Sequence, residues 1–187
     1  MSALYQRENT LALLHEFTRT DSLRKHAYAV EASMRAAAER TGSDVEYWSA
    51  VGLLHDFDYE MYPEAPDHPL KGAEILRERG YPEEFVRTIL SHASYTGVPR
   101  ENLCARWLFA VDELSGFCMA CAMVQPDKKI AQVKVKSVRK KLKKKDFAAK
   151  VNREEIAEGA ADLGLEQDEV IEHVLQALAP AAGELGL

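Results

Sequence analysis

The chain has 187 residues, of which 47% are hydrophobic and 29% charged, so it is long and apolar enough to bury a core and is not a disordered chain. Its net charge of −6 argues against a dedicated nucleic-acid binder. Three cysteines cannot build a disulfide framework, and the N-terminus lacks the basic start and long apolar run of a signal peptide, so we expect a cytoplasmic protein.

Helix start and stop signals recur along the chain, while no strand pattern and no internal repeat is apparent. Prolines and glycines separate the expected helices, and Pro99 precedes the apolar helix that carries Asp112. The expected helices run from Asp21 or Ser22 to about Arg40, from Asp44 to about Phe57, from Asp67 to Gly80, from Pro82 to near 94–97, over 103–124, from Asn152 to Gly164, and from Gln167 to Ala179. The sequence therefore predicts an all-α protein, an irregular multi-helix bundle.

The most apolar stretch runs from Leu103 to Val124 and contains Arg106, Asp112 and Glu113. Charges at that depth in a bilayer are expensive, so we expect a buried helix and no contact with a membrane.

A change in composition near Pro126 divides the chain into an expected helical domain, 1–125, and a C-terminal helical extension, 126–187, packed on it. The segment Lys134–Lys145 holds eight basic residues in twelve. A solvated helix face is the usual explanation of such a run. The alternative is that some of these lysines, with Arg139 and Arg153, line the mouth of a site and collect an anionic substrate, or contact nucleic acid.

Metal-ligand side chains stand at helix positions where an apolar residue is expected. A single histidine on an apolar face is more often a core residue than a ligand, but a buried unpaired carboxylate requires a cation or strong donors. Gly52, one turn before Asp56, leaves that carboxylate open to approach. A shared cation would explain the whole set, which is His26, His55 and His92 with the carboxylates Asp56 and Asp112.

Mixed imidazole and carboxylate ligands suit manganese, iron, zinc, cobalt or nickel better than calcium. Four protein ligands on an octahedral metal leave positions open for water and substrate, which is typical of a catalytic site. We therefore expect one or two divalent transition metal ions as cofactors.

The order of these residues resembles the signature of the HD superfamily of metal-dependent phosphohydrolases over roughly residues 20–120. The matching residues are His26, the His55-Asp56 pair in GLLHDFD, and Asp112 in FAVDELSG. His68 in HPLKGAEIL and His92 in ILSHASY resemble the two extra histidines of dinuclear members, which completes an H…HD…H…H…D pattern. The tail from KVKSVRKKLKKKDF onward resembles a group of uncharacterised HD hydrolases.

The resemblance implies a helical HD-type domain and a division of the ligands between two metals. His26, His55, Asp56 and Asp112 would hold the first metal, with Asp56 bridging to a second metal held by His68 and His92. The alternative for His68 is helix capping or simple solvation.

The implied reaction is hydrolysis of a phosphoester or phosphoanhydride in a small phosphorylated, nucleotide-like molecule, with Asp56, His92 and Lys71 as catalytic residues. Lys71, one turn after His68, could reach a phosphate or could be an exposed lysine. Asp58 could support the ligands or could be a solvated loop carboxylate.

Two alternatives stay open. The same ligands would suit an HD-fold diiron oxygenase, or the fold could serve as a non-catalytic nucleotide-binding module. The chain lacks a GYP sequence after His92, so the resemblance does not extend to cyclic dinucleotide hydrolysis. Cys118 and Cys121 have CxxC spacing in apolar surroundings and are expected to be buried core residues. The sequence leaves the oligomeric state open.

Overall fold

A computed structural model describes residues 3–187, and residues 1 and 2, the start of the expected unit 1–125, lie outside this part of the chain. The described residues form ten α-helices and no strand, which confirms the predicted all-α bundle. No helix within residues 3–187 is long and apolar enough to span a membrane. The α-helices are α1 (Arg7–Phe17), α2 (Asp21–Thr41), α3 (Val45–Leu54), α4 (Asp67–Glu78), α5 (Glu83–Leu90), α6 (Leu103–Met123), α7 (Val135–Leu142), α8 (Arg153–Leu163), α9 (Gln167–Leu178) and α10 (Ala182–Leu185).

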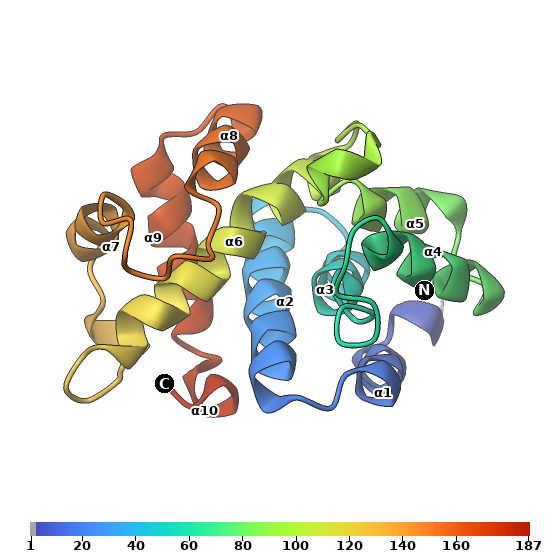
Figure 1. The fold of residues 1–187 in the computed structure, drawn as a ribbon, viewed down its shortest axis with the longest axis horizontal. Coiled ribbons are helices and arrows are strands. Elements are labelled where there is room, and N and C mark those ends of the chain that lie inside the picture. The colour runs from blue at the N-terminus through green and yellow to red at the C-terminus, as the bar shows by residue number, and fades with distance from the viewer. Residues whose placement is uncertain (1–2) are drawn as a thin grey trace.

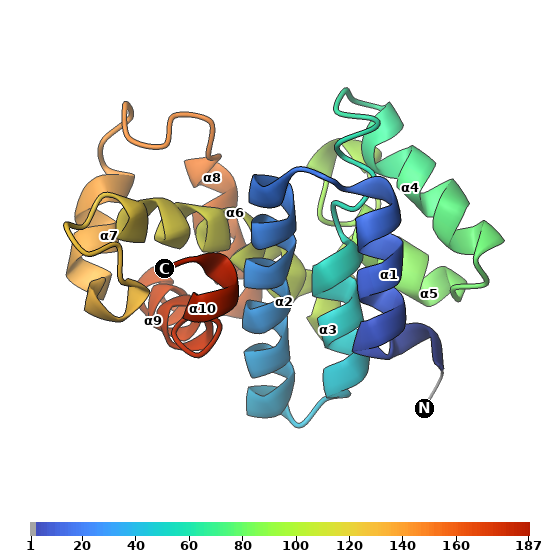
Figure 2. The same ribbon diagram turned by 90° about the horizontal axis from the view of Figure 1, so that it is seen from below.

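Helix α2 stands in the middle of the molecule, with α1, α3, α4 and α5 on one side and α7, α8 and α9 on the other (Figures 1 and 2). It packs extensively against α3, α6 and α9, while α6 also packs along α8. One cluster of buried apolar side chains includes residues before and after Pro126. The division into 1–125 and 126–187 stays a prediction.

Several helix ends follow the expected local signals. The Asp44 carboxylate accepts a hydrogen bond from the backbone N–H of Tyr47 at 3.0 Å, and the Asn102 side chain accepts one from Ala105 at 2.8 Å. Gly42 ends α2 with a φ of 68°, a left-handed conformation that glycine adopts without strain. The expected caps Asp21 and Ser22 are wrong, because Thr20 is the N-cap and Asp21 already belongs to the helix.

Two helix ends and the backbone at one helix start differ from the sequence prediction, and all three places concern expected ligands. Helix α3 ends at Leu54 instead of Phe57, and α5 ends at Leu90 instead of near 94–97, so His55 and His92 lie just past helix ends. At the start of α4, His68 has an extended backbone with ψ of 134°. Helical periodicity therefore does not govern the directions of the His68 and His92 imidazoles. His55, the C-cap of α3, keeps helical dihedrals with φ of −59° and ψ of −38°.

Candidate metal centre

A close approach of α2 and α3 brings the first two histidines together. A Cβ atom on Gly52 would lie 3.0 Å from the Cα of Glu31 and 3.0 Å from the carbonyl oxygen of Val30, so only glycine allows this approach without displacement. The expectation that Gly52 leaves Asp56 open was therefore wrong: the missing side chain makes room for α2.

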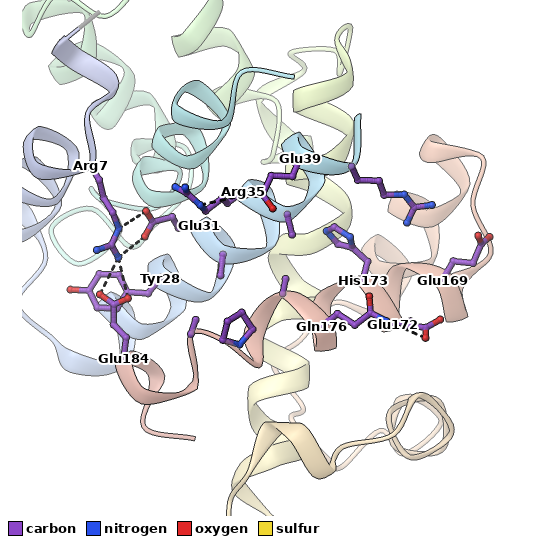
Figure 3. A pocket seen from close by; sticks show the side chains of 16 residues that line it. Arg7, Tyr28, Glu31, Arg35, Glu39, Glu169, Glu172, His173, Gln176 and Glu184 are labelled. Atoms are coloured by element: carbon purple, nitrogen blue, oxygen red, sulfur yellow. Dashed lines mark hydrogen bonds and ion pairs between the residues drawn. The ribbon is translucent and has the colours of Figure 1, made fainter. Parts of the chain in front are cut away.

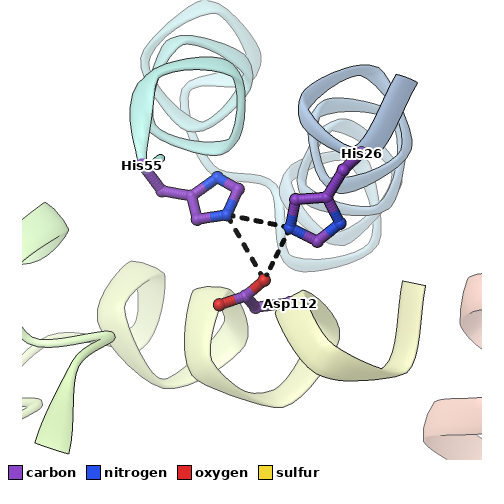
Figure 4. Close-up of side chains that lie close together, drawn as sticks. All are labelled: His26, His55 and Asp112. Atoms are coloured by element: carbon purple, nitrogen blue, oxygen red, sulfur yellow. Dashed lines mark hydrogen bonds and ion pairs between the residues drawn. The ribbon is translucent and has the colours of Figure 1, made fainter. Parts of the chain in front are cut away.

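His26 from α2, His55 at the end of α3 and Asp112 from α6 form a first triad (Figure 4). The Asp112 Oδ1 atom lies 3.0 Å from His26 Nε2 and 3.3 Å from His55 Nε2, and the two nitrogens are 3.3 Å apart. Each residue thus offers one ligand atom toward a common point. Figure 4 shows all three side chains converging from different helices.

Asp56, His68 and His92 form a second triad beside the first. The Asp56 Oδ1 atom lies 3.2 Å from Nε2 of His68 and 3.2 Å from Nε2 of His92. Its other oxygen, Oδ2, lies 3.5 Å from His55 Nε2 and 3.8 Å from His26 Nε2. One carboxylate therefore faces both triads, with one oxygen toward each.

Hydrogen bonds at Nδ1 hold three of these imidazoles in one tautomer. His55 Nδ1 donates to the carbonyl oxygen of Gly52 at 2.8 Å, and His92 Nδ1 donates to that of Ile89 at 2.6 Å. His68 Nδ1 donates to the Asp58 carboxylate at 2.9 Å. Since Nδ1 carries the hydrogen, the neutral rings present a lone pair at Nε2, which is the form that binds metals.

Asp58 is fully buried and supports the second triad. Its Oδ1 accepts the hydrogen bond from His68, and its Oδ2 accepts one from the backbone N–H of Gly72 at 2.8 Å. A Cβ on Gly72 would lie 2.7 Å from the Asp58 carboxyl carbon, so glycine is required for this contact. Of the two interpretations of Asp58, the structure favours the supporting residue over the solvated carboxylate.

The electrostatics of the two triads fit a cation. Burial alone would lower the pKa of His55, but the carboxylates of Asp56 and Asp112 outweigh it and raise the pKa to about 10. The pKa of His68 rises to about 9 for the same reason, against its burial and through Asp56 and Asp58. The histidines in turn hold the pKa of Asp56 and of Asp112 below its usual range, although burial opposes this.

A metal ion satisfies these atoms better than protons do. Asp56 Oδ1 is buried and has no hydrogen-bond partner within the described part of the chain, although Nε2 of His68 and Nε2 of His92 each lie 3.2 Å from it. Two ligand atoms at about 2.1 Å from one metal and at right angles lie about 3 Å apart, close to the distances within each triad. The donor set of each triad is thus compatible with a divalent metal ion.

A cavity of about 470 Å³ opens beside the triads. Sequence reasoning missed four of the side chains that line it: Tyr59, Tyr95, Glu113 and Glu155. Burial and the neighbouring Asp112 carboxylate raise the pKa of Glu113 to about 7. Glu155 comes from α8, so the C-terminal part of the chain forms one wall, which no local sequence signal indicates.

The expected basic contacts do not line this cavity. Lys71 is exposed and its Nζ atom forms an ion pair with Glu74 at 3.0 Å. Arg139 pairs with Asp168 at 2.8 Å, and Arg153 donates to backbone carbonyls such as that of Val151 at 2.8 Å. No residue of 134–145 is among the lining residues. The structure therefore does not bring Lys71, Arg139, Arg153 or the basic segment to the triads.

A larger cavity of about 930 Å³ lies between α2 and α9 and contains none of the triad residues (Figure 3). At one end Arg7 pairs with the buried Glu31 at 2.7 Å and with Glu184 at 3.0 Å. His173 in its wall donates a hydrogen bond from Nε2 to the carbonyl oxygen of Ser33 at 3.0 Å. This cavity brings together no cluster of metal ligands among residues 3–187.

Comparisons with known proteins agree with the ligand pattern. The family model described as HD domain matches residues 23–116, half of the chain. A tRNA (cytidine(56)-2'-O)-methyltransferase of Thermoplasma volcanium is 29% identical over 85 residues, which cover 46% of this chain and 25% of that enzyme. The chain thus spans about a quarter of the length of this curated relative. No solved structure matches the chain.

Proposed function

We propose that this chain, which belongs to the HD domain family, is a metal-dependent phosphohydrolase that cleaves a phosphoester or phosphoanhydride in a small molecule. The observation that carries the proposal is the position of Asp56 between two triads of ligand atoms, with one oxygen toward each. A carboxylate shared by two metals is typical of centres that hydrolyse phosphate esters.

The six residues would divide between two metals. His26, His55 and Asp112 would hold the first, His68 and His92 the second, and Asp56 would bind both. When bound, divalent transition metals supply Lewis acids that neutralise phosphoryl oxygens and lower the pKa of water.

The chain's own side chains fix and shield this centre. The Nδ1 hydrogen bonds of His55, His68 and His92 keep each Nε2 aimed at its triad, so the ligands need little reorganisation when a metal binds. Asp56 would help to hold both metals, since one of its oxygens faces each triad. In this proposal Asp56 and His92 serve as ligands beside the reacting phosphate, and Lys71 takes no part.

The substrate we propose is a small molecule and not a tRNA. The Thermoplasma volcanium relative is named for a reaction on tRNA, but the chain matches only a quarter of it. The cavity beside the triads, of about 470 Å³, has the size of a small-ligand site and lacks the basic lining that an RNA backbone would need.

The test is phosphate release from 4-nitrophenyl phosphate and from a panel of nucleotides, with metal-free protein reconstituted with manganese, iron, cobalt, nickel or zinc. We expect metal-dependent release by the wild type and none by Asp56→Ala, while Asp146→Ala, which changes an exposed carboxylate, stays active. No release with any metal would overturn the proposal.

A diiron oxygenase is the second candidate, because four imidazoles and two carboxylates in two triads also suit iron. Oxygen consumption by the iron-loaded protein, without phosphate release, would favour this candidate. Ligand binding without either reaction would favour a non-catalytic nucleotide-binding module.

A further inference from the structure

The cavity beside the two triads contains no lysine and no arginine among its lining residues. Besides the ligands, its charged side chains are the carboxylates Glu113 and Glu155. The rest of the wall is aromatic, apolar or small, with Tyr59 and Tyr95 as the largest side chains. This lining is unusual for a site that receives phosphate, which is generally met by basic residues.

Cations that could reach a phosphate are held elsewhere. Lys71, on the helix that begins near His68, is paired with Glu74. The guanidinium of Arg153, two residues before Glu155, donates to the carbonyl oxygen of Val151 in the preceding loop and to that of Leu142 at the end of α7. Two metals are therefore the positive charges that the proposed centre would offer to a substrate.

Charge balance limits what the cavity can accept. Two divalent metals with the carboxylates Asp56 and Asp112 and the buried Asp58 would leave a charge of about +1, which one phosphomonoester group of about −1.5 to −2 more than neutralises. Glu113 and Glu155 then remain without a counter-charge. A second phosphate, as in a nucleoside diphosphate, would face these carboxylates, whereas a cationic group would pair with them.

The two tyrosines complete a surface suited to an ammonium group. The ring of Tyr59 meets the His68 ring edge-on, with centroids 5.2 Å apart, and the hydroxyl of Tyr95 donates to the carbonyl oxygen of His68 at 2.7 Å. Both contacts hold the rings beside the second triad, while 38% of Tyr59 and 56% of Tyr95 remain exposed. Aromatic faces next to carboxylates bind organic cations.

We propose that the cavity selects phosphomonoesters whose alcohol part carries an ammonium group, with the phosphate at the two triads and the ammonium between Glu113, Glu155 and the two tyrosines. This inference rests on the proposed phosphohydrolase function. In the reaction, water forms a new bond to phosphorus, the bond from phosphorus to the alcohol oxygen breaks, and a proton passes to that oxygen. The products are inorganic phosphate and an amino alcohol.

The test is isothermal titration calorimetry on the manganese-loaded protein with two probes of similar shape, 2-aminoethyl phosphate and propyl phosphate. We expect the amino compound to bind about tenfold more tightly. The Glu155→Gln variant should lose this preference. Glu154→Gln is the matched control, since it removes the charge of the preceding, exposed residue of the same helix and should keep the preference.

The outcomes separate this inference from the proposed function. Equal binding of the two probes, or an unchanged preference in Glu155→Gln, would overturn the inference, and hydrolysis of other phosphoesters would leave the function standing. Tighter binding of the amino compound without phosphate release under any metal would support the selectivity and overturn the function. Binding of neither probe would overturn the inference.

Discussion

The two triads have similar donor sets but are built in different ways. The first takes His26 and Asp112 from the interiors of α2 and α6, with His55 at the end of α3, and these three helices pack together in the core. The second takes His68 and His92 from beyond regular helix, and the hydrogen bond from His68 to Asp58 fixes one of them. The first triad therefore depends on helix packing and the second on buried polar contacts.

The two triads should therefore be sensitive to different substitutions. A change in the core should affect the first triad together with the stability of the fold, because the same contacts serve both. A change in the supporting hydrogen bonds should affect the second triad with less effect on the rest of the molecule.

Among substitutions that leave the six candidate ligands in place, the largest effect is expected for Asp58→Ala. It removes the carboxylate that orients His68, and loss of such a partner typically costs about 10–100-fold in metal affinity. We expect this loss for the second metal only, measured by competition with a chelator. Asp67→Ala, an exposed carboxylate at the start of α4, is the control and should bind both metals as the wild type does.

An equal loss of affinity for both metals in Asp58→Ala would contradict the view that the two triads are supported in different ways, because it would mean that they share one support. Unchanged affinity would show that His68 keeps its direction without Asp58.

Gly52→Ala tests the packing that supports the first triad. The added methyl group would press against α2 at 3.0 Å, and overpacking of this kind typically costs about 1–3 kcal/mol of the free energy of unfolding. Chemical denaturation of the metal-free protein would measure the loss. Gly183→Ala is the control, because no atom lies within 4 Å of the new Cβ, and stability equal to that control would contradict the packing account.

The pH dependence of the metal-free protein should reflect the raised pKa values of His55, about 10, and His68, about 9. Their protonated forms stabilise the fold fully below the unfolded pKa of about 6.5, and this stability is lost as the pH rises through about 9 to 10. From pH 7 to pH 10 we expect the free energy of unfolding of the metal-free protein to fall by on the order of 1 kcal/mol. The melting temperature should fall by about 2–4 °C as a result. The melting temperature should fall less in the metal-loaded protein, since metals bind neutral imidazoles. An equal fall with and without metal would show that deprotonation of His55 and His68 is not the cause.

The smallest effect is expected for Lys71→Ala. The sequence suggested a catalytic role for this lysine, whereas the structure places it away from the triads. Because Lys71 is exposed and paired with Glu74, phosphate release and metal content should match the wild type. A large loss of phosphate release with unchanged metal content would restore the catalytic role expected from the sequence.

The sequence predicted the all-α fold class, which the structure confirms, because its helix signals recur along the chain. The ordered HD pattern indicated the six candidate ligands, and metal binding by these residues stays a prediction. It misplaced Lys71, since the non-helical backbone of His68 and Pro69 breaks the spacing on which that expectation depended. It also misread Gly52, whose neighbours belong to another helix.

The walls of the cavity were beyond sequence reasoning for a related reason. Glu155 reaches the site only because α8 packs on α6, where a Cβ on Gly159 would lie 2.5 Å from the Cα of Ala110. This contact joins residues far apart in the chain, and the sequence around Gly159 or Ala110 has no local pattern that predicts it. Tyr59 likewise lies in a turn and Tyr95 in a short 3-10 helix, Ser94–Thr96, and both segments are too short to show periodicity.

The number of metals per chain, measured by elemental analysis, would show whether Asp56 joins two metal sites. We predict about two transition metals per chain in the reconstituted wild type, about one in His92→Ala, and a loss from both sites in Asp56→Ala. A single metal per chain that survives both substitutions would contradict the account.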